Sequence, residues 1–118
     1  MISFTDEEQG GGLDLIVVTE KFFSASGLLS KSKNFEFRPE QQQMAIAVAK
    51  ALKGSEHLIV EAGTGVGKSL AYLVPAIFHA VSQNKKAVIS THTINLQEQL
   101  TEKDLPMLKQ VLPVEFSF

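Results

Sequence analysis

Residues 62–69 decide the fold, and they read in order Ala62, Gly63, Thr64, Gly65, Val66, Gly67, Lys68 and Ser69. This is the Walker A pattern, with alanine in the position of the first glycine. A polyphosphate needs several backbone N–H groups turned toward one point, and glycines allow the chain to wrap that tightly. We therefore expect residues 62–69 to form a phosphate-binding loop.

The last residues of this loop carry the chemistry. Lys68 is expected to place its charge beside the β and γ phosphates of ATP, and Ser69 to offer a hydroxyl ligand to Mg²⁺. A helix that begins near Gly67 adds partial positive charge at the same point. The alternative is a plain Gly-rich turn. The apolar segment before the loop and the helical stretch after it favour the phosphate-binding interpretation.

Helical and short apolar segments alternate around the loop. The expected helices cover residues 40–52, 67–83 and 94–101. The expected strands cover residues 57–60, 87–90 and 114–118. Asp104 is expected to cap a further helix that ends near Leu112. Strands separated by helices predict an α/β fold, with parallel strands and helices on the faces of the sheet.

The length allows at most one compact domain, because 118 residues fall below the roughly 150 of a common domain. Gly10, Gly11 and Gly12 interrupt the N-terminal part, so we expect residues 1–35 to be an extension or connector and residues 36–118 to be the domain. Within the extension, residues 13–23 suit a helix or a strand, and the pattern leaves the choice open.

Charge and cysteine content narrow the function classes. The formal net charge of −2 neither suggests nor excludes a nucleic-acid partner. The absence of cysteine excludes disulfides, thiolate metal sites and an iron–sulfur cluster in this chain. No apolar run is long enough to span a bilayer, and the acidic start is unlike a secretory signal. We expect a cytoplasmic protein with no membrane partner.

Two further segments suggest binding chemistry. A glutamine at a helix start, such as Gln41, can pair with both the donor and acceptor edges of adenine, although glutamines there are more often solvated. Residues 90–100 place hydroxyls and a helix start after a predicted strand, which suits nucleic-acid phosphates or an ordinary capped helix. His92 has no companion at a metal-ligand spacing.

These segments, in this order, resemble the start of the helicase core of DinG/XPD-like superfamily 2 DNA helicases. The matching stretches are residues 37–45, 60–75 and 90–100, and the resemblance covers about three-quarters of the chain. It implies a partial RecA-like P-loop NTPase domain that uses ATP and magnesium. The family hydrolyses ATP to move along single-stranded DNA and unwind the duplex.

The resemblance also assigns residues. It implies that Gln41 and Arg38 recognise adenine, and that Lys68 and Ser69 are catalytic. The implied phosphate-loop contacts are Ala62, Gly63, Thr64, Gly65, Val66, Gly67, Lys68 and Ser69, with Ser69 also the magnesium ligand. The implied contacts to single-stranded DNA are Thr91, His92, Thr93 and Gln97.

Hydrolysis requires groups that this sequence does not supply. A Walker B acidic pair is absent after Ser69, and Arg38, the only arginine, belongs to the adenine block. In RecA-like sheets other strands lie between the two that contain residues 57–61 and 87–91, so we expect an incomplete sheet with unpaired edges. We expect a truncated or fragmentary helicase that is inactive alone. A small P-loop phosphotransferase and a non-enzymatic interaction module remain alternatives.

Overall fold

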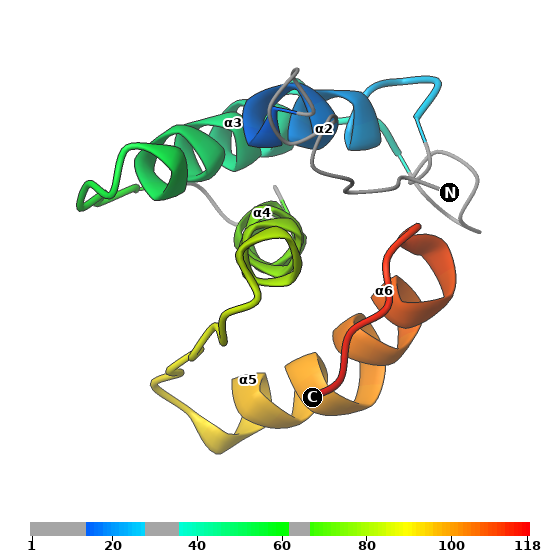
Figure 1. Ribbon diagram of the computed structural model, residues 1–118. Coiled ribbons are helices and arrows are strands. Elements are labelled where there is room, and N and C mark those ends of the chain that lie inside the picture. The colour runs from blue at the N-terminus through cyan, green and yellow to red at the C-terminus, as the bar shows by residue number, and fades with distance from the viewer. Residues whose placement is uncertain (1–13, 28–35, 62–66) are drawn as a thin grey trace.

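The computed structural model describes residues 14–27, 36–61 and 67–118, and every regular element in these ranges is helical. In chain order the elements are α2 (Leu15–Phe22), α3 (Pro39–Lys53), α4 (Lys68–Gln83), α5 (Ile94–Gln99), the π-helical turn η2 (Leu100–Asp104) and α6 (Leu105–Val111). Helix α4 lies in the middle, with α2 and α3 on one side and the run from α5 to α6 on the other (Figure 1). None of the helices in the described ranges has the length and apolarity needed to cross a membrane.

The open choice for residues 13–23 is decided in favour of a helix. Asp14 is the N-cap of α2, and its side chain accepts a 2.7 Å hydrogen bond from the Ile16 N–H. Helix α2 contributes Phe22 to the core, and the ring of Phe22 meets that of Phe78 on α4 edge-on, with 6.3 Å between centroids. Helix α2, which lies before position 36, therefore packs against α4, while the domain boundary at 35/36 stays a prediction.

Helices α3 and α4 confirm the expected helices to within one residue at each end. Pro39 occupies the first turn of α3, where its missing N–H costs nothing, and Gly54 is the C-cap after the last helical residue, Lys53. Helix α4 ends at Asn84 in the left-handed conformation, and the Lys85 N–H closes on the Ala80 carbonyl at 2.8 Å. The buried residues of α4 lie on several of its faces, as expected for a central helix: Ala71, Leu73, Val74, Pro75, Ile77 and Phe78.

The expected helix ending near Leu112 is present as α6, but the prediction that Asp104 caps it was wrong. An N-cap residue has extended backbone, but Asp104 has helical angles (φ −70°, ψ −50°) and makes no capping bond. The helical run continues instead through η2, where the Leu105 N–H donates to the Leu100 carbonyl five residues back. Pro106 explains the wide turn, because its ring would clash with the carbonyl of Glu102 in regular α-helical register.

The expected strands do not form in the described residues. Residues 57–60, 87–90 and 114–118 have no regular secondary structure, and no strand occurs in the ranges that the structure describes. Ile59 is 98% exposed and Val88 is 92% exposed, so both segments present apolar side chains to solvent. A strand is held by its ladder of hydrogen bonds to a neighbour. Neither segment has such a ladder among the described residues, so the predicted parallel sheet is not confirmed by this structure.

Candidate nucleotide-binding site

The start of α4 is the described end of the predicted phosphate loop. Gly67 is the N-cap and has φ +76°, in the left-handed region that favours glycine. Lys68 and Ser69 are the first two residues of the helix, with Lys68 exposed and Ser69 half-buried. The N–H groups of a first helical turn lack intrahelical acceptors and point beyond the helix end, which is the arrangement that binds anions.

Gln41 from α3 contacts this helix start. Its side chain is buried, and Nε2 donates a 3.1 Å hydrogen bond to the carbonyl oxygen of Gly67. The same oxygen accepts the 3.3 Å hydrogen bond from the Ala71 N–H that begins α4. The structure therefore brings together two predicted site residues that lie 26 positions apart in the sequence. It also shows that Gln41 is buried rather than solvated, the alternative left open by its sequence context.

The fit at this contact depends on glycine. A Cβ on Gly67 would overlap Gln41 Nε2, and φ +76° strains any side chain. Residue 67 thus has two independent reasons to be glycine, one from its backbone and one from its neighbour.

Arg38 lies at the same end of α3 as Gln41. It is the N-cap residue, with extended backbone at φ −129°, and its Nη2 is 3.7 Å from Glu36 Oε2. The two predicted adenine-contacting residues are therefore both at the start of α3. Five predicted loop residues fall outside the described ranges, so their phosphate contacts stay predictions: Ala62, Gly63, Thr64, Gly65 and Val66.

The donors at this site fit magnesium only together with a nucleotide. No group of three or more His, Asp or Glu side chains that could hold a metal occurs in the described ranges. The start of α4 offers one hydroxyl, from Ser69, and one ammonium, from the preceding Lys68. Magnesium prefers oxygen ligands and keeps several waters while it binds substrate phosphates, so one protein hydroxyl suits it as a partial ligand.

The predicted DNA-contacting residues lie before and within α5. Thr93 is the N-cap, and its Oγ1 accepts a 3.1 Å hydrogen bond from the Leu96 N–H. The Thr91 hydroxyl donates to the Thr93 carbonyl at 3.1 Å. His92 and Gln97 are exposed. Both threonine hydroxyls thus shape the turn into α5, and the ordinary capped-helix interpretation describes their contacts in this structure.

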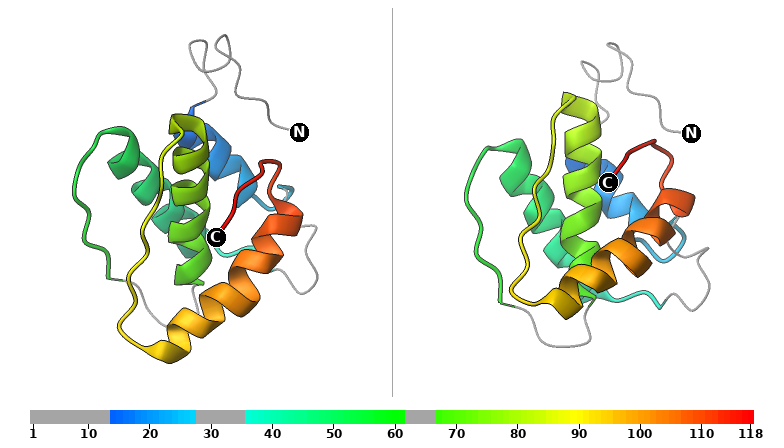
Figure 2. Two further views of the ribbon diagram at one scale, coloured as in Figure 1. Left: turned by 60° about the horizontal axis from the view of Figure 1, so that its bottom comes forward. Right: turned by 90° about the horizontal axis from the view of Figure 1, so that it is seen from below.

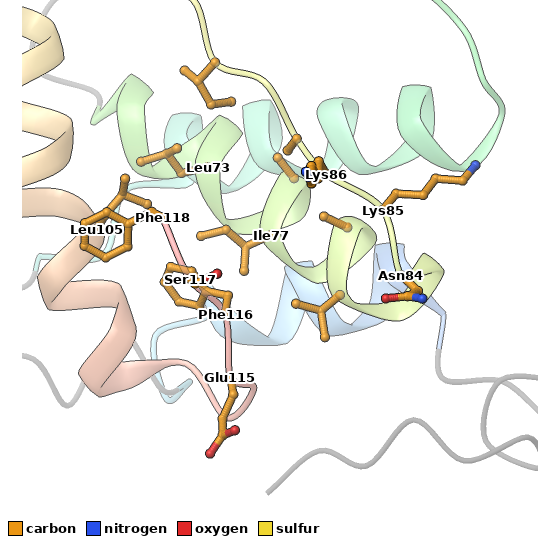
Figure 3. Close-up of a pocket in the computed structure, with 15 residues that line it drawn as sticks. Leu73, Ile77, Asn84, Lys85, Lys86, Leu105, Glu115, Phe116, Ser117 and Phe118 are labelled. Atoms are coloured by element: carbon orange, nitrogen blue, oxygen red, sulfur yellow. The ribbon is translucent and has the colours of Figure 1, made fainter.

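A groove of about 520 Å³ lies along the other half of α4 (Figure 3). Leu73 and Ile77 form its floor, and Phe116 and Phe118 from the C-terminal segment flank it. Among the described residues, its lining includes neither residues 67–69 nor the α3 start, so it is separate from the described part of the candidate nucleotide site.

Two polar contacts that the sequence reasoning missed connect α2 to α3. Gln42 Nε2 donates a 2.9 Å hydrogen bond to the Glu20 carbonyl. Lys53 Nζ forms an ion pair with the Asp14 carboxylate, and this contact, followed by the Ile16 N–H, holds the pKa of Asp14 below its usual value. The cap at Asp14 could have been recognised from an aspartate before an apolar run. No local pattern indicates which helix Gln42 contacts.

Comparison with known proteins decides the family. A family model described as DEAD/DEAH box helicase matches residues 39–116, which is well over half of the chain. The chain belongs to the DEAD/DEAH box helicase family. The match includes α3, the phosphate loop and α4, so the contact between Gln41 and Gly67 lies inside the helicase domain.

Curated helicases that resemble the chain agree with this family. The "ATP-dependent helicase DinG" of Mycobacterium tuberculosis (strain ATCC 25618 / H37Rv) is 59% identical over 71 residues, which are 60% of this chain and 11% of that protein. The "ATP-dependent DNA helicase DinG" of Photobacterium profundum is 50% identical over 90 residues, which are 72% of this chain and 13% of that protein.

The "ATP-dependent DNA helicase YoaA" of Haemophilus influenzae is 48% identical over 91 residues, covering 76% of this chain and 14% of that protein. The resemblance to DinG-like helicases is thus confirmed. The chain matches about one-eighth of the length of these relatives.

Proposed function

We propose that residues 39–116 form the ATP-binding start of a DinG-like ATP-dependent DNA helicase. The hydrogen bond from Gln41 to Gly67 is the observation that carries this proposal, because it joins the predicted adenine block to the predicted phosphate loop. The family match and the printed names of the relatives support the same function.

Each end of the nucleotide has its own residues in this proposal. Gln41 and Arg38, at the start of α3, bind adenine, and the loop of residues 62–69 binds the phosphates. Lys68 neutralises charge on the β and γ phosphates, and Ser69 contributes its hydroxyl to the magnesium that accompanies ATP. That magnesium would supply further neutralisation of phosphate charge. The first-turn amides of α4 add a fixed positive potential that needs no reorganisation when ATP binds.

Single-stranded DNA is the proposed macromolecular substrate of the whole protein. Thr91, His92, Thr93 and Gln97 would lie along its phosphate backbone, with the exposed side chains of His92 and Gln97 as the donors. The DNA helicase names of the relatives support this assignment and favour a cytoplasmic location, beside bacterial DNA.

The parallel sheet is also part of the proposal. The segments at 57–60 and 87–90 carry large apolar side chains on both faces, which is typical of strands buried within a parallel sheet. In the whole helicase, further strands would pair with them and cover Ile59 and Val88. Hydrolysis would require further residues, because this chain has no acidic pair for magnesium and water after Ser69 and no second arginine.

A titration of the 118-residue chain with a fluorescent ATP analogue and magnesium tests nucleotide binding. We expect saturable binding by the unsubstituted chain and loss of binding in Lys68→Ala. Binding should be weaker in Gln41→Ala, because adenine and the carbonyl of Gly67 both lose the Gln41 side chain as a partner. Gln43→Ala is the matched control, since Gln43 is exposed on the same helix. Unlabelled ATP should compete better than GTP.

Other outcomes favour the alternatives or overturn the proposal. No nucleotide affinity in a folded chain would indicate an interaction module, and ADP production with an added phosphate acceptor would indicate a phosphotransferase. Micromolar affinity retained in Lys68→Ala would contradict the role of Lys68. We also expect no DNA-stimulated ATP hydrolysis by the chain alone.

A further inference from the structure

Helix α2 holds α3 near both of its ends. At the start of α3, Gln42 Nε2 donates to the Glu20 carbonyl at 2.9 Å. At the end of α3, Lys53 is paired with Asp14, the N-cap of α2. The two contact points are eleven residues apart on α3, which is about 16 Å at a rise of 1.5 Å per residue. Both points together fix how far α3 can slide and how far it can rotate against α2.

The contact at Gln42 is adjacent to the candidate nucleotide site. Successive residues of a helix point about 100° apart, so Gln41 and Gln42 can reach different neighbours. Gln41 contacts Gly67 at the start of α4, and Gln42 contacts α2. A rotation of α3 that breaks one of these hydrogen bonds must also displace the other side chain.

Apolar burial alone does not fix the position of α3 against α2. Helices α2 and α3 share a core with α4 that includes Phe22 and Ala45, but hydrophobic contact is non-directional and permits small sliding movements. Hydrogen bonds and ion pairs have narrow distance requirements and so resist those movements. The two polar contacts are partly exposed, which makes them contributors to position more than to stability.

We propose that α2 is a positioning clamp for the nucleotide site, with Gln42 and Lys53 as the positioning residues that keep Gln41 against Gly67. The proposal rests on the function given above for the importance of that contact to ATP. It assigns a role in nucleotide binding to residues 14–22, which lie before the residues that the helicase family model matches.

Hydrogen exchange of the Gln41 side-chain amide, followed by ¹⁵N NMR on the full chain, tests the clamp without any nucleotide. We expect exchange to become three- to tenfold faster in Gln42→Ala and in Lys53→Ala. Matched controls are Gln43→Ala and Lys50→Ala, because both residues are exposed on the same helix, and their effects should stay below twofold. Lys53→Arg keeps the charge and should restore slow exchange.

Thermal unfolding distinguishes loss of the clamp from a general loss of stability. If α2 only adds stability, exchange will follow the melting temperature in all four alanine variants alike, and the clamp is overturned. It is also overturned if the Gln42 and Lys53 variants exchange at the rates of their controls. Lys53 is a partly exposed surface residue, so its variant is expected to fold even if Gln42→Ala does not.

Titration of the same variants with the fluorescent ATP analogue distinguishes the two proposals. We expect a three- to tenfold weaker affinity in Gln42→Ala and Lys53→Ala, with Lys53→Arg restored. Absence of binding in the unsubstituted chain would overturn the proposed function, while faster Gln41 exchange in the two variants would still support the clamp. Unchanged exchange with normal ATP binding would overturn the clamp alone.

Discussion

Gln41 Nε2 lies 3.1 Å from the carbonyl oxygen of Gly67, and this hydrogen bond joins the start of α3 to the start of α4. Gly67 is in the left-handed conformation, and Gln41 fills the space that a Cβ on Gly67 would need. The backbone of the phosphate loop and the adenine block are therefore fitted to each other at one residue.

Substitution of Gly67 tests this fit. Gly67→Ala should destabilise the chain by about 1–2 kcal/mol from the left-handed backbone alone, with a further loss from displacement of Gln41. Urea unfolding measures the change. Gly54→Ala is the matched control, because Gly54 has φ −87° and the nearest atom to an added Cβ is Glu56 Oε1, 2.8 Å away on a flexible side chain. Equal stability of the two variants would contradict the account of Gly67.

Asp14 should make stability depend on acid pH. The hydrogen bond from Lys53 lowers the folded pKa of Asp14 below its ordinary value of 3.8. The contribution of Asp14 to stability is therefore present above pH 3.8 and is lost as the pH falls through the lowered folded pKa. Asp14→Asn keeps a capping side chain but loses the ion pair, and should cost less than about 1 kcal/mol at pH 7.

Unfolding free energies from pH 7 down to pH 2 measure this effect. The difference between Asp14→Asn and the unsubstituted chain should shrink toward the acid end. Asp14→Ala also loses the cap and should cost about 1 kcal/mol more than the asparagine variant. Glu20→Gln, on an exposed position of α2, serves as the control. A pH-independent difference for Asp14→Asn would refute the ion-pair explanation.

Asp104 should change the pH dependence of stability in the direction opposite to Asp14. Burial in the helical run raises its folded pKa above 3.8, although Gln99 and Lys103 oppose the shift. A raised pKa means that stability is fully present below pH 3.8 and declines as the pH rises through the folded pKa. Asp104→Asn should therefore stabilise the chain at pH 7, within about 1 kcal/mol. The gain should vanish near pH 3, and Glu102→Gln, exposed in the same turn, should show none.

The exposed extended segments predict self-association. Ile59 and Val88 are almost fully exposed, at 98% and 92%, on segments with no strand pairing in the described ranges. Ile59→Lys combined with Val88→Lys should reduce concentration-dependent light scattering, because charged side chains oppose edge pairing. Stability should change by less than about 0.5 kcal/mol for each site. Ile77→Lys, at a position only 8% exposed, should instead unfold the chain. Scattering unaffected by the double substitution would argue against edge pairing.

The helices around the nucleotide site could be predicted from the sequence because their signals are local. Pro39 and Gly54 mark the two ends of α3, and Gly67 marks the start of α4. The continuation of the helical run through Asp104 could not be predicted, because an aspartate suits either a helix cap or a helix interior. Pro106 decides between the two, since it favours the wide turn η2 that keeps Asp104 inside the run.

The predicted strands are absent from the described residues for a physical reason of another kind. Ile59 and Val88 have strong strand propensity, but a strand requires a neighbouring strand, and propensity does not indicate whether one is present. Figure 2 shows the extended segment after α4 running beside that helix. The contact of Gln41 with Gly67 was not predicted, since sequence spacing does not indicate which side chains meet across a fold. The resemblance to the helicases assigned both residues to one nucleotide site without implying that they touch.

The most direct test of ATP binding is a magnesium–ATP titration of the ¹⁵N-labelled chain. We expect saturable shifts of the backbone amides of Gly67, Lys68 and Ser69 and of the Gln41 side-chain amide, all of them lost in Lys68→Ala. Shifts confined to the groove beside Phe116, or no shifts at all in the folded chain, would contradict this expectation.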